Sequence, residues 1–390
     1  MPASAIRKLV PWSEAAEASG VKVYHLNVGA PDIQSPDCAI EAIKRRGEGM
    51  HHLSYTHSAG LRELREAMVS KYYRRIGIEL DPSEVLITVG GSEAFAIAMQ
   101  IAANPGEEIL VFEPFYTNYQ TFAYLNGISL KAVPTDIREG FRIPDLSELD
   151  KYVTPSTRAV MISNPCNPSG KLFSKAEIMD LGAFCIKHGL FFICDEVYRE
   201  FCYTDEAYFS SMNVPGCADN VILVDSVSKR YNLCGARIGV IASHNKDVMA
   251  CALKFAQSRL CPPVLGQYSA IGALDTPDSY FQAVREEYIK RRDCAVDALN
   301  SMPGVFSPRP NGAFYTVAEL PLEDAGDFAK WLLTNFRMDG QTVMITPAAS
   351  FYKTSGAGCS QARIAYVLEV PQLQKAMAVL GSAIEEYKKR

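Results

Sequence analysis

The sequence lacks several features that would assign the protein to a specialised class. It contains no Cys-x-x-Cys pair, no internal repeat, no low-complexity tract and no Walker-type phosphate loop. Its longest apolar runs are only as long as strands, so we expect no membrane-spanning helix. The first 20 residues also lack the apolar core of a signal peptide. These absences disfavour a membrane protein and a disulfide-stapled secreted domain.

Charge of one sign is also not in excess anywhere along the chain. The formal net charge is −5 with both signs interspersed, so no field favours nucleic acid or a membrane surface as a partner. The eleven cysteines are an odd number, and Cys185, Cys194 and Cys251 lie inside apolar runs. This pattern is typical of free thiols, and we therefore expect a cytoplasmic protein.

Three histidines, His51, His52 and His57, could suggest a metal site. They lie in a loop-like stretch that has no accompanying pattern of cysteines or carboxylates. We therefore expect them to be polar surface residues, and the sequence predicts no metal ion.

Length and periodicity favour two domains around an α/β core. The 390 residues are 48% apolar and 21% charged, which is typical of globular proteins. Strand-length apolar runs alternate with helical patterns from about residue 85 to 241, which predicts a mostly parallel sheet covered on both faces. A long helix is expected at about 280–299. After it, short strands such as 313–317 mix with helices, which predicts a smaller α+β domain.

The most informative motif follows the apolar run at 221–224, which predicts a buried strand. Ser226-Val227-Ser228-Lys229 comes directly after this run, and Arg237 lies eight residues beyond the lysine. A lysine at a strand end can hold an aldehyde cofactor as a Schiff base while neighbouring hydroxyls and an arginine bind its phosphate. The alternative is a solvated surface lysine.

Other polar residues also follow predicted strands. Asn167 lies in the proline-rich turn 164–170, and Asp195 and Tyr198 follow the apolar run at 190–194. Ligands bind at the carboxyl ends of strands in open α/β sheets, so these side chains are expected to share one site. Asp195 could otherwise be a helix N-cap.

A glycine turn provides a second element of that site. The strand expected at 85–89 runs through Gly90-Gly91-Ser92-Glu93 into an apolar helix. Free backbone N–H groups and the helix dipole meet at such a turn and favour a bound phosphate.

Taken in order, these motifs resemble those of the class I aminotransferases, which have the type I fold of pyridoxal-phosphate enzymes. The resemblance extends from Asn27 to Arg363. It implies an α/β large domain at 46–285 that binds pyridoxal 5′-phosphate and a small α+β domain at 286–390, with the N-terminal segment 1–45 packing on the small domain. It also implies a homodimer.

The resemblance further implies a role for each site residue. Lys229 would hold the cofactor and act as general base, which requires burial and nearby cations to lower its pKa. Asp195 would pair with the pyridine nitrogen, and Asn167 and Tyr198 would donate to the phenolic oxygen. The remaining cofactor ligands implied are Gly91, Ser92 and Glu93 through their amides, Ser226, Ser228, Arg237, the stacking Tyr116, and Tyr55 on the partner's phosphate.

The substrate side of the site is less fully implied. Arg363 matches the residue that binds the α-carboxylate, and Gly29 matches one that lets the backbone approach the same group. In the best-known aspartate enzymes an arginine binds the second carboxylate, but Ala256 occupies that position here. Arg259 is a candidate replacement, with a solvated interface residue or a phosphate ligand as the alternatives. Cys166 receives no role.

The expected reaction is ping-pong amino-group transfer from an acidic or broad range of L-amino acids to a 2-oxo acid such as 2-oxoglutarate. A C–S lyase of the same fold remains an alternative, because the same machinery serves β-elimination. A ligand-binding regulator is disfavoured, since residues 1–30 are too few and not basic enough for a DNA-binding domain.

Overall fold

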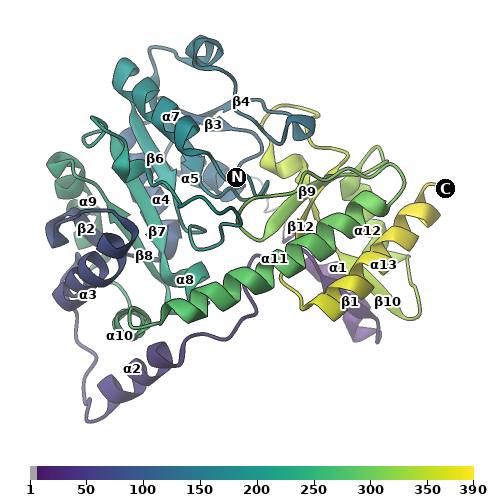
Figure 1. The fold of residues 1–390 in the computed structure, drawn as a ribbon, viewed down its shortest axis with the longest axis horizontal. Helices are drawn as coiled ribbons and strands as arrows, with labels where there is room; N and C mark the ends of the chain where they lie inside the picture. The colour runs from purple at the N-terminus through teal and green to yellow at the C-terminus, as the bar shows by residue number, and fades with distance from the viewer. Residues whose placement is uncertain (1–6) are drawn as a thin grey trace.

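A mostly parallel sheet of seven strands organises the larger part of the molecule within residues 7–390, the residues that this computed structural model describes (Figure 1). Only β8 runs antiparallel to its neighbours in this sheet. The strands, in spatial order, are β2 (Val85–Val89), β8 (Ile238–Ala242), β7 (Val221–Ser226), β6 (Phe191–Asp195), β5 (Thr157–Ser163), β3 (Glu108–Phe112) and β4 (Ser129–Val133). The predicted α/β sheet is confirmed.

Both faces of this sheet are buried, which explains the unbroken apolar runs in the sequence. Along β7, Val221 and Leu223 enter the core on one face, whereas Ile222 and Val224 enter the core on the other. One face is covered by α4 (Gly90–Ala102), α5 (Asn118–Leu125) and α9 (Lys246–Arg259). The other is covered by α2 (Asp37–Gly47), α3 (Arg62–Ala67), α7 (Lys175–His188) and α10 (Val264–Ala273). The short helices are α6 (Leu146–Leu149) and α8 (Val227–Arg230).

A second, smaller group of elements contains two further sheets. One is an antiparallel sheet of three strands, in the spatial order β11 (Thr346–Pro347), β12 (Gln361–Ala365) and β9 (Tyr315–Glu319). Strand β1 (Lys22–His25) pairs in parallel with β10 (Gln341–Met344), so the N-terminal segment packs with the C-terminal part. Residues 1–6 of the expected N-terminal segment lie outside the described residues. The helices here are α1 (Val10–Ala18), α12 (Ala325–Thr334) and α13 (Val370–Tyr387).

The long helix α11 (Asp278–Ser301) connects the two groups (Figure 1). Its buried residues Val284, Tyr288 and Leu299 belong to the core of the smaller group. The strand expected at 313–317 begins later, at Tyr315, because Ala313 has φ +54° and cannot be extended.

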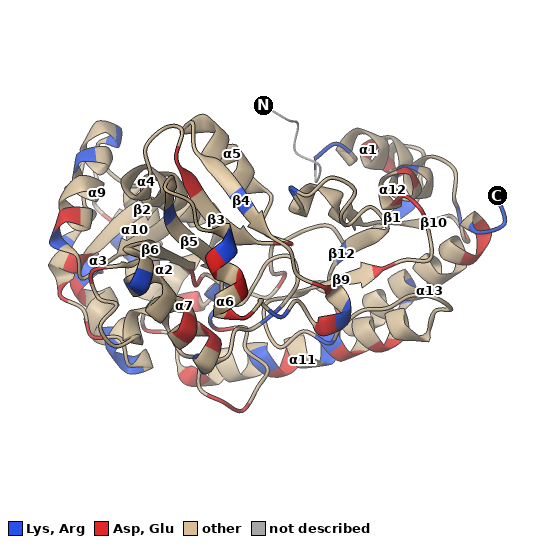
Figure 2. Cartoon of the chain, turned by 90° about the horizontal axis from the view of Figure 1, so that it is seen from above, with Lys and Arg blue, Asp and Glu red and all other residues tan. Residues whose placement is uncertain are grey.

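Surface charge has no dominant sign in this arrangement, since blue and red residues alternate over the helices (Figure 2). In the part of the chain that the structure describes, no helix is both long and apolar enough to cross a membrane. The same residues contain no cluster of three histidine, cysteine or acidic side chains that could hold a metal ion. All eleven cysteines are free.

Candidate active site

A cavity of about 400 Å³ opens at the carboxyl ends of β6 and β7. Asp195 is the last residue of β6 and Ser226 the last of β7, while Arg363 enters from β12 in the smaller group. The cavity therefore lies between the two groups of elements. The sequence-predicted residues that line it are Gly29, Gly91, Ser92, Tyr116, Asn167, Asp195, Tyr198, Ser226, Ser228, Lys229, Arg237 and Arg363.

The amine of Lys229 is buried in this cavity. Its Nζ donates to the Gly29 carbonyl at 2.8 Å and lies 3.7 Å from the Cys234 sulfur. Burial lowers the pKa of Lys229, and the guanidinium groups of Arg237 and Arg363 lower it further, while Cys234 acts in the opposite direction. The amine is therefore closer to its neutral, nucleophilic form than an ordinary lysine.

Asp195 is a buried carboxylate whose hydrogen-bond partners are neutral. The Tyr119 hydroxyl donates to Oδ2 at 2.6 Å, and the Val197 amide donates to Oδ1 at 3.2 Å. Burial raises the pKa of Asp195 from 3.8 to about 7. A carboxylate in such surroundings fits a bound group that presents a cationic N–H to it.

The turn between β2 and α4 forms a cup for an anion. Gly90 has φ +69°, and a Cβ there would lie 2.2 Å from Nη2 of Arg237, so only glycine fits this close approach. The hydroxyls of Ser226 and Ser228 lie 2.8 Å apart in the same cavity lining, and a Cβ on Gly91 would lie 4.0 Å from the Cβ of Ser226, so these hydroxyls adjoin the turn. Helix-terminal amides, hydroxyls and one arginine are the groups that bind phosphate.

Arg363 is a buried cation that is 2% exposed. It donates to Oδ1 of Asn167 at 3.1 Å and to the carbonyl of Asn27 at 2.7 Å. Its Nε has no hydrogen-bond partner among the described residues. A guanidinium held this way still needs an acceptor, and a carboxylate fits its planar fork.

Comparison with known proteins accounts for this set of groups. The aminotransferase class I and II family matches the chain over residues 21–377. The chain belongs to this family. An aspartate aminotransferase of Pyrococcus abyssi is 32% identical over 376 residues, which cover 95% of this chain and 94% of the relative. An aromatic-amino-acid aminotransferase of Thermococcus litoralis is 30% identical, covering 99% and 96%.

Solved structures give the same family fold. A single mutant of Thermus thermophilus aspartate aminotransferase superimposes with a TM-score of 0.89 at 28% identity, covering 98% of this chain and 97% of the other. An alanine aminotransferase of Pyrococcus furiosus gives 0.88 at 29%, with 98% of each chain covered. The protein is thus a type I pyridoxal-phosphate-dependent aminotransferase, and the buried lysine, the anion cup and Asp195 fit that cofactor.

A chain of tyrosines closes one wall of the aminotransferase cavity. The Tyr198 hydroxyl accepts from Nδ2 of Asn167 at 3.4 Å and lies 3.1 Å from that of Tyr315, which donates to the Gly29 carbonyl at 3.3 Å. Burial raises the pKa of Tyr198 well above its usual value, so its hydroxyl keeps its proton. A Cβ on Gly29 would lie 2.4 Å from the Tyr315 oxygen, which explains the glycine.

Three predicted site residues do not line this cavity. Tyr55 is 78% exposed and borders a separate hollow together with Arg259. The carboxylate of Glu93 pairs with Nε of Arg259 at 3.0 Å, and two backbone carbonyls accept from the remaining arginine nitrogens at 3.1 and 3.3 Å. Each of the three Arg259 nitrogens therefore has an acceptor within its own chain, an arrangement that fits a structural role for this residue.

Sequence reasoning missed two tyrosines at the aminotransferase site. Tyr119 donates to Asp195, and Tyr315 borders both Tyr198 and Arg363. Tyr119 lies in the first turn of α5, three residues after Tyr116, which precedes this helix, and no sequence pattern connects it with Asp195. Tyr315 belongs to no sequence motif. Its neighbours in the site come from distant parts of the chain, so the sequence alone gives no signal for its role.

Proposed function

We propose that the protein moves an amino group from an L-α-amino acid to a 2-oxo acid in two half-reactions at one cavity. One observation carries the proposal: a buried lysine, a buried carboxylate and a buried arginine, from three different elements, converge on this cavity. When bound, pyridoxal phosphate supplies an electron-accepting ring that eases loss of the Cα proton.

The residues of the chain then divide the work by position. Lys229 would hold the cofactor and, once freed, would move the proton at the substrate Cα. Asp195 would keep the ring nitrogen protonated, and Arg363 would bind the α-carboxylate. Gly91, Ser92, Ser226, Ser228 and Arg237 would hold the phosphate, Tyr116 would pack against the ring, and Asn167 and Tyr198 would donate to the phenolic oxygen.

We propose an acidic or broad range of amino donors with 2-oxoglutarate as acceptor. The relatives are named for aspartate, aromatic amino acids and prephenate, so the family includes both acidic and apolar substrates. The cavity lining includes apolar side chains, Val28, Ala30 and Phe95, which suit a broad range of donors.

We also propose a cytoplasmic homodimer. The hollow that Tyr55 and Arg259 border also includes Leu53 and Leu265, which are 63% and 40% exposed. An exposed apolar surface of this kind supports a partner subunit, to whose phosphate Tyr55 would extend.

A substrate screen tests the proposed reaction. Purified protein is incubated with single amino acids, with and without 2-oxoglutarate, and glutamate, pyruvate and ammonia are measured. The proposal expects glutamate to form only when both substrates are present. Pyruvate and ammonia without any added oxo acid would instead indicate the C–S lyase.

A further inference from the structure

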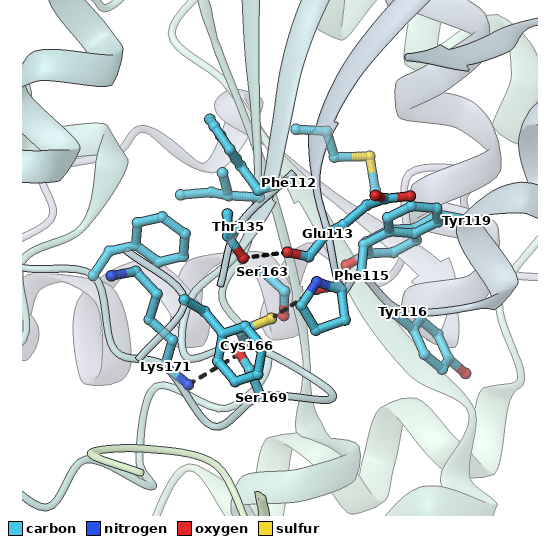
Figure 3. A pocket seen from close by; sticks show the side chains of 15 residues that line it. Phe112, Glu113, Phe115, Tyr116, Tyr119, Thr135, Ser163, Cys166, Ser169 and Lys171 are labelled. Atoms are coloured by element: carbon cyan, nitrogen blue, oxygen red, sulfur yellow. Dashed lines mark hydrogen bonds between the residues drawn. The ribbon is translucent and has the colours of Figure 1, made fainter. Parts of the chain in front are cut away.

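Glu113 is a buried carboxylate that the proposed reaction does not use. It directly follows β3, just before Pro114, and is 2% exposed. Together with Tyr116 and other side chains drawn in Figure 3, it lines a narrow hollow of about 20 Å³. Its Oε1 accepts from two backbone amides, those of Lys353 and, at 2.8 Å, Thr354. Both donors belong to the smaller group of elements.

Two further hydrogen bonds join the same two segments. The Phe115 amide donates to the Phe351 carbonyl at 3.0 Å, and the Gln120 side chain donates to the Ser350 carbonyl at 3.3 Å. We call this set of contacts between residues 113–120 and 350–354 the clasp. It fastens the loop after β11 to the carboxyl end of β3.

The clasp connects two residues that line the active-site cavity, Tyr116 and Arg363. On one side, Tyr116 follows Glu113 by three residues and lines the cavity. On the other, the Phe351 ring lies 5.3 Å from the guanidinium carbon of Arg363. Thr346, two residues before the η8 turn (Ala348–Phe351), pairs with Arg363 in the sheet. If this loop moved, the position of Arg363 would therefore change in two ways: its backbone pairs with Thr346, and its guanidinium packs against Phe351.

We propose that Glu113 is a positioning residue for substrate binding: its carboxylate anchors residues 350–354, and this anchor keeps Arg363 directed at the substrate carboxylate. The inference rests on the proposed function. Hydrogen bonds to a charged acceptor are stronger than neutral ones, and removing the acceptor leaves two inward-facing amides unpaired. Tyr116 is the one proposed cofactor contact within the clasp, whereas Lys229, Asp195 and the proposed phosphate ligands lie on other elements, so most of the cofactor's binding does not depend on this coupling.

Kinetics of Glu113→Ala and Glu113→Gln test the positioning role. Glutamine keeps an oxygen at the acceptor position, whereas alanine removes it. We expect Glu113→Ala to raise the KM for amino donor and oxo acid by about tenfold or more, with a much smaller fall in kcat and a change of less than about threefold in the affinity for pyridoxal phosphate. Glu113→Gln should stay within about threefold of wild type. Glu139→Ala removes an exposed carboxylate nearby and serves as the control.

Hydrogen exchange of the Lys353 and Thr354 amides provides a readout that does not depend on activity. In the cofactor-free protein, both amides should exchange faster in Glu113→Ala than in wild type, and Glu113→Gln should restore protection. If Glu113→Ala does not fold, Gln120→Ala opens the same clasp at another bond and should change KM and exchange in the same direction.

Two results would overturn the proposal. Fast exchange with an unchanged KM would make the clasp purely structural, and a raised KM with protected amides would place the effect of Glu113 elsewhere. If wild-type protein transfers no amino groups at all, the proposed function fails. In that case the exchange experiment still decides whether Glu113 anchors the loop.

Discussion

Two ionisable residues at the centre of the cavity are shifted toward their neutral forms. Burial lowers the pKa of the Lys229 amine and raises the pKa of the Asp195 carboxyl to about 7. The neutral amine of Lys229 is the form that attacks an aldehyde, and Asp195 lacks the cationic partner that a protonated ring nitrogen would supply. The same shifts make the cofactor-free protein sensitive to pH.

Asp195→Asn should change how the stability of the cofactor-free protein depends on pH. Because the folded-state pKa of Asp195 is raised, its stabilising contribution is complete below about pH 4 and is lost as the pH rises through about 7. Wild type should therefore lose up to about 4 kcal/mol relative to Asp195→Asn over this range. Urea denaturation at a series of pH values measures the difference.

Parallel stability curves for the two proteins would show that Asp195 does not titrate in this way. Saturating pyridoxal phosphate provides the control, because a cationic ring nitrogen should hold Asp195 ionised and reduce the pH dependence of the difference.

Lys229→Ala should abolish amino-group transfer and leave the fold intact. Among the described residues that line the cavity, Lys229 supplies the lysine amine, and its loss removes both the attachment point and the base. Activity, circular dichroism and the visible absorbance of the purified protein measure the outcome. Lys254→Ala, on the exposed side of α9, is the matched control. Near-normal turnover by Lys229→Ala would contradict the proposed mechanism.

At the scale of elements, strand ends were predictable and distant contacts were not. Asp195 and Ser226 were found because each ends an apolar run, which is a local signal. The partners of Arg259 could not be found this way, since Glu93 lies 166 residues earlier in the chain. Tyr315 was likewise hidden, because its neighbours in the cavity come from other strands. Local pattern thus predicts the sheet and one edge of the site, and tertiary packing decides the rest.

Arg259→Ala should weaken the junction of α9, β2 and α4 rather than change substrate preference. The arginine ends α9, pairs with Glu93 in the first turn of α4 and donates to the carbonyl of Ile87 in β2. We expect a loss of about 1–3 kcal/mol in the free energy of unfolding, because Glu93 would lose its partner. The kcat/KM for aspartate and for alanine should fall by the same factor. A loss confined to aspartate would return Arg259 to a substrate-binding role.

At the scale of the whole molecule, the cavity depends on both groups of elements and, we propose, on a second subunit. Asp195 and Lys229 belong to the large sheet and its helices, whereas Tyr315 and Arg363 come from the small antiparallel sheet. Tyr55 projects from the surface outside this cavity. If each site contains residues from two subunits, mixing two chains that are defective at different residues should restore some activity.

Hybrid dimers test the contribution of Tyr55. Lys229→Ala and Tyr55→Trp subunits, each impaired alone, should recover part of the activity when mixed, because one hybrid cavity receives an intact lysine and an intact partner tyrosine. Activity after subunit exchange, followed by tagged-chain copurification, gives the result. Exchange without recovery would mean that each site is built from a single chain.

The pairing of β1 with β10 also sets an order for folding during synthesis. Every strand of the large sheet has left the ribosome once residue 242 has emerged, but residues 22–25 have no sheet partner until residues 341–344 follow. The N-terminal segment, first to be made, is therefore among the last to be placed, and it must stay unpaired while most of the chain is translated. Limited proteolysis of stalled chains should find this segment cleavable at 300 residues and protected only after the full chain is released.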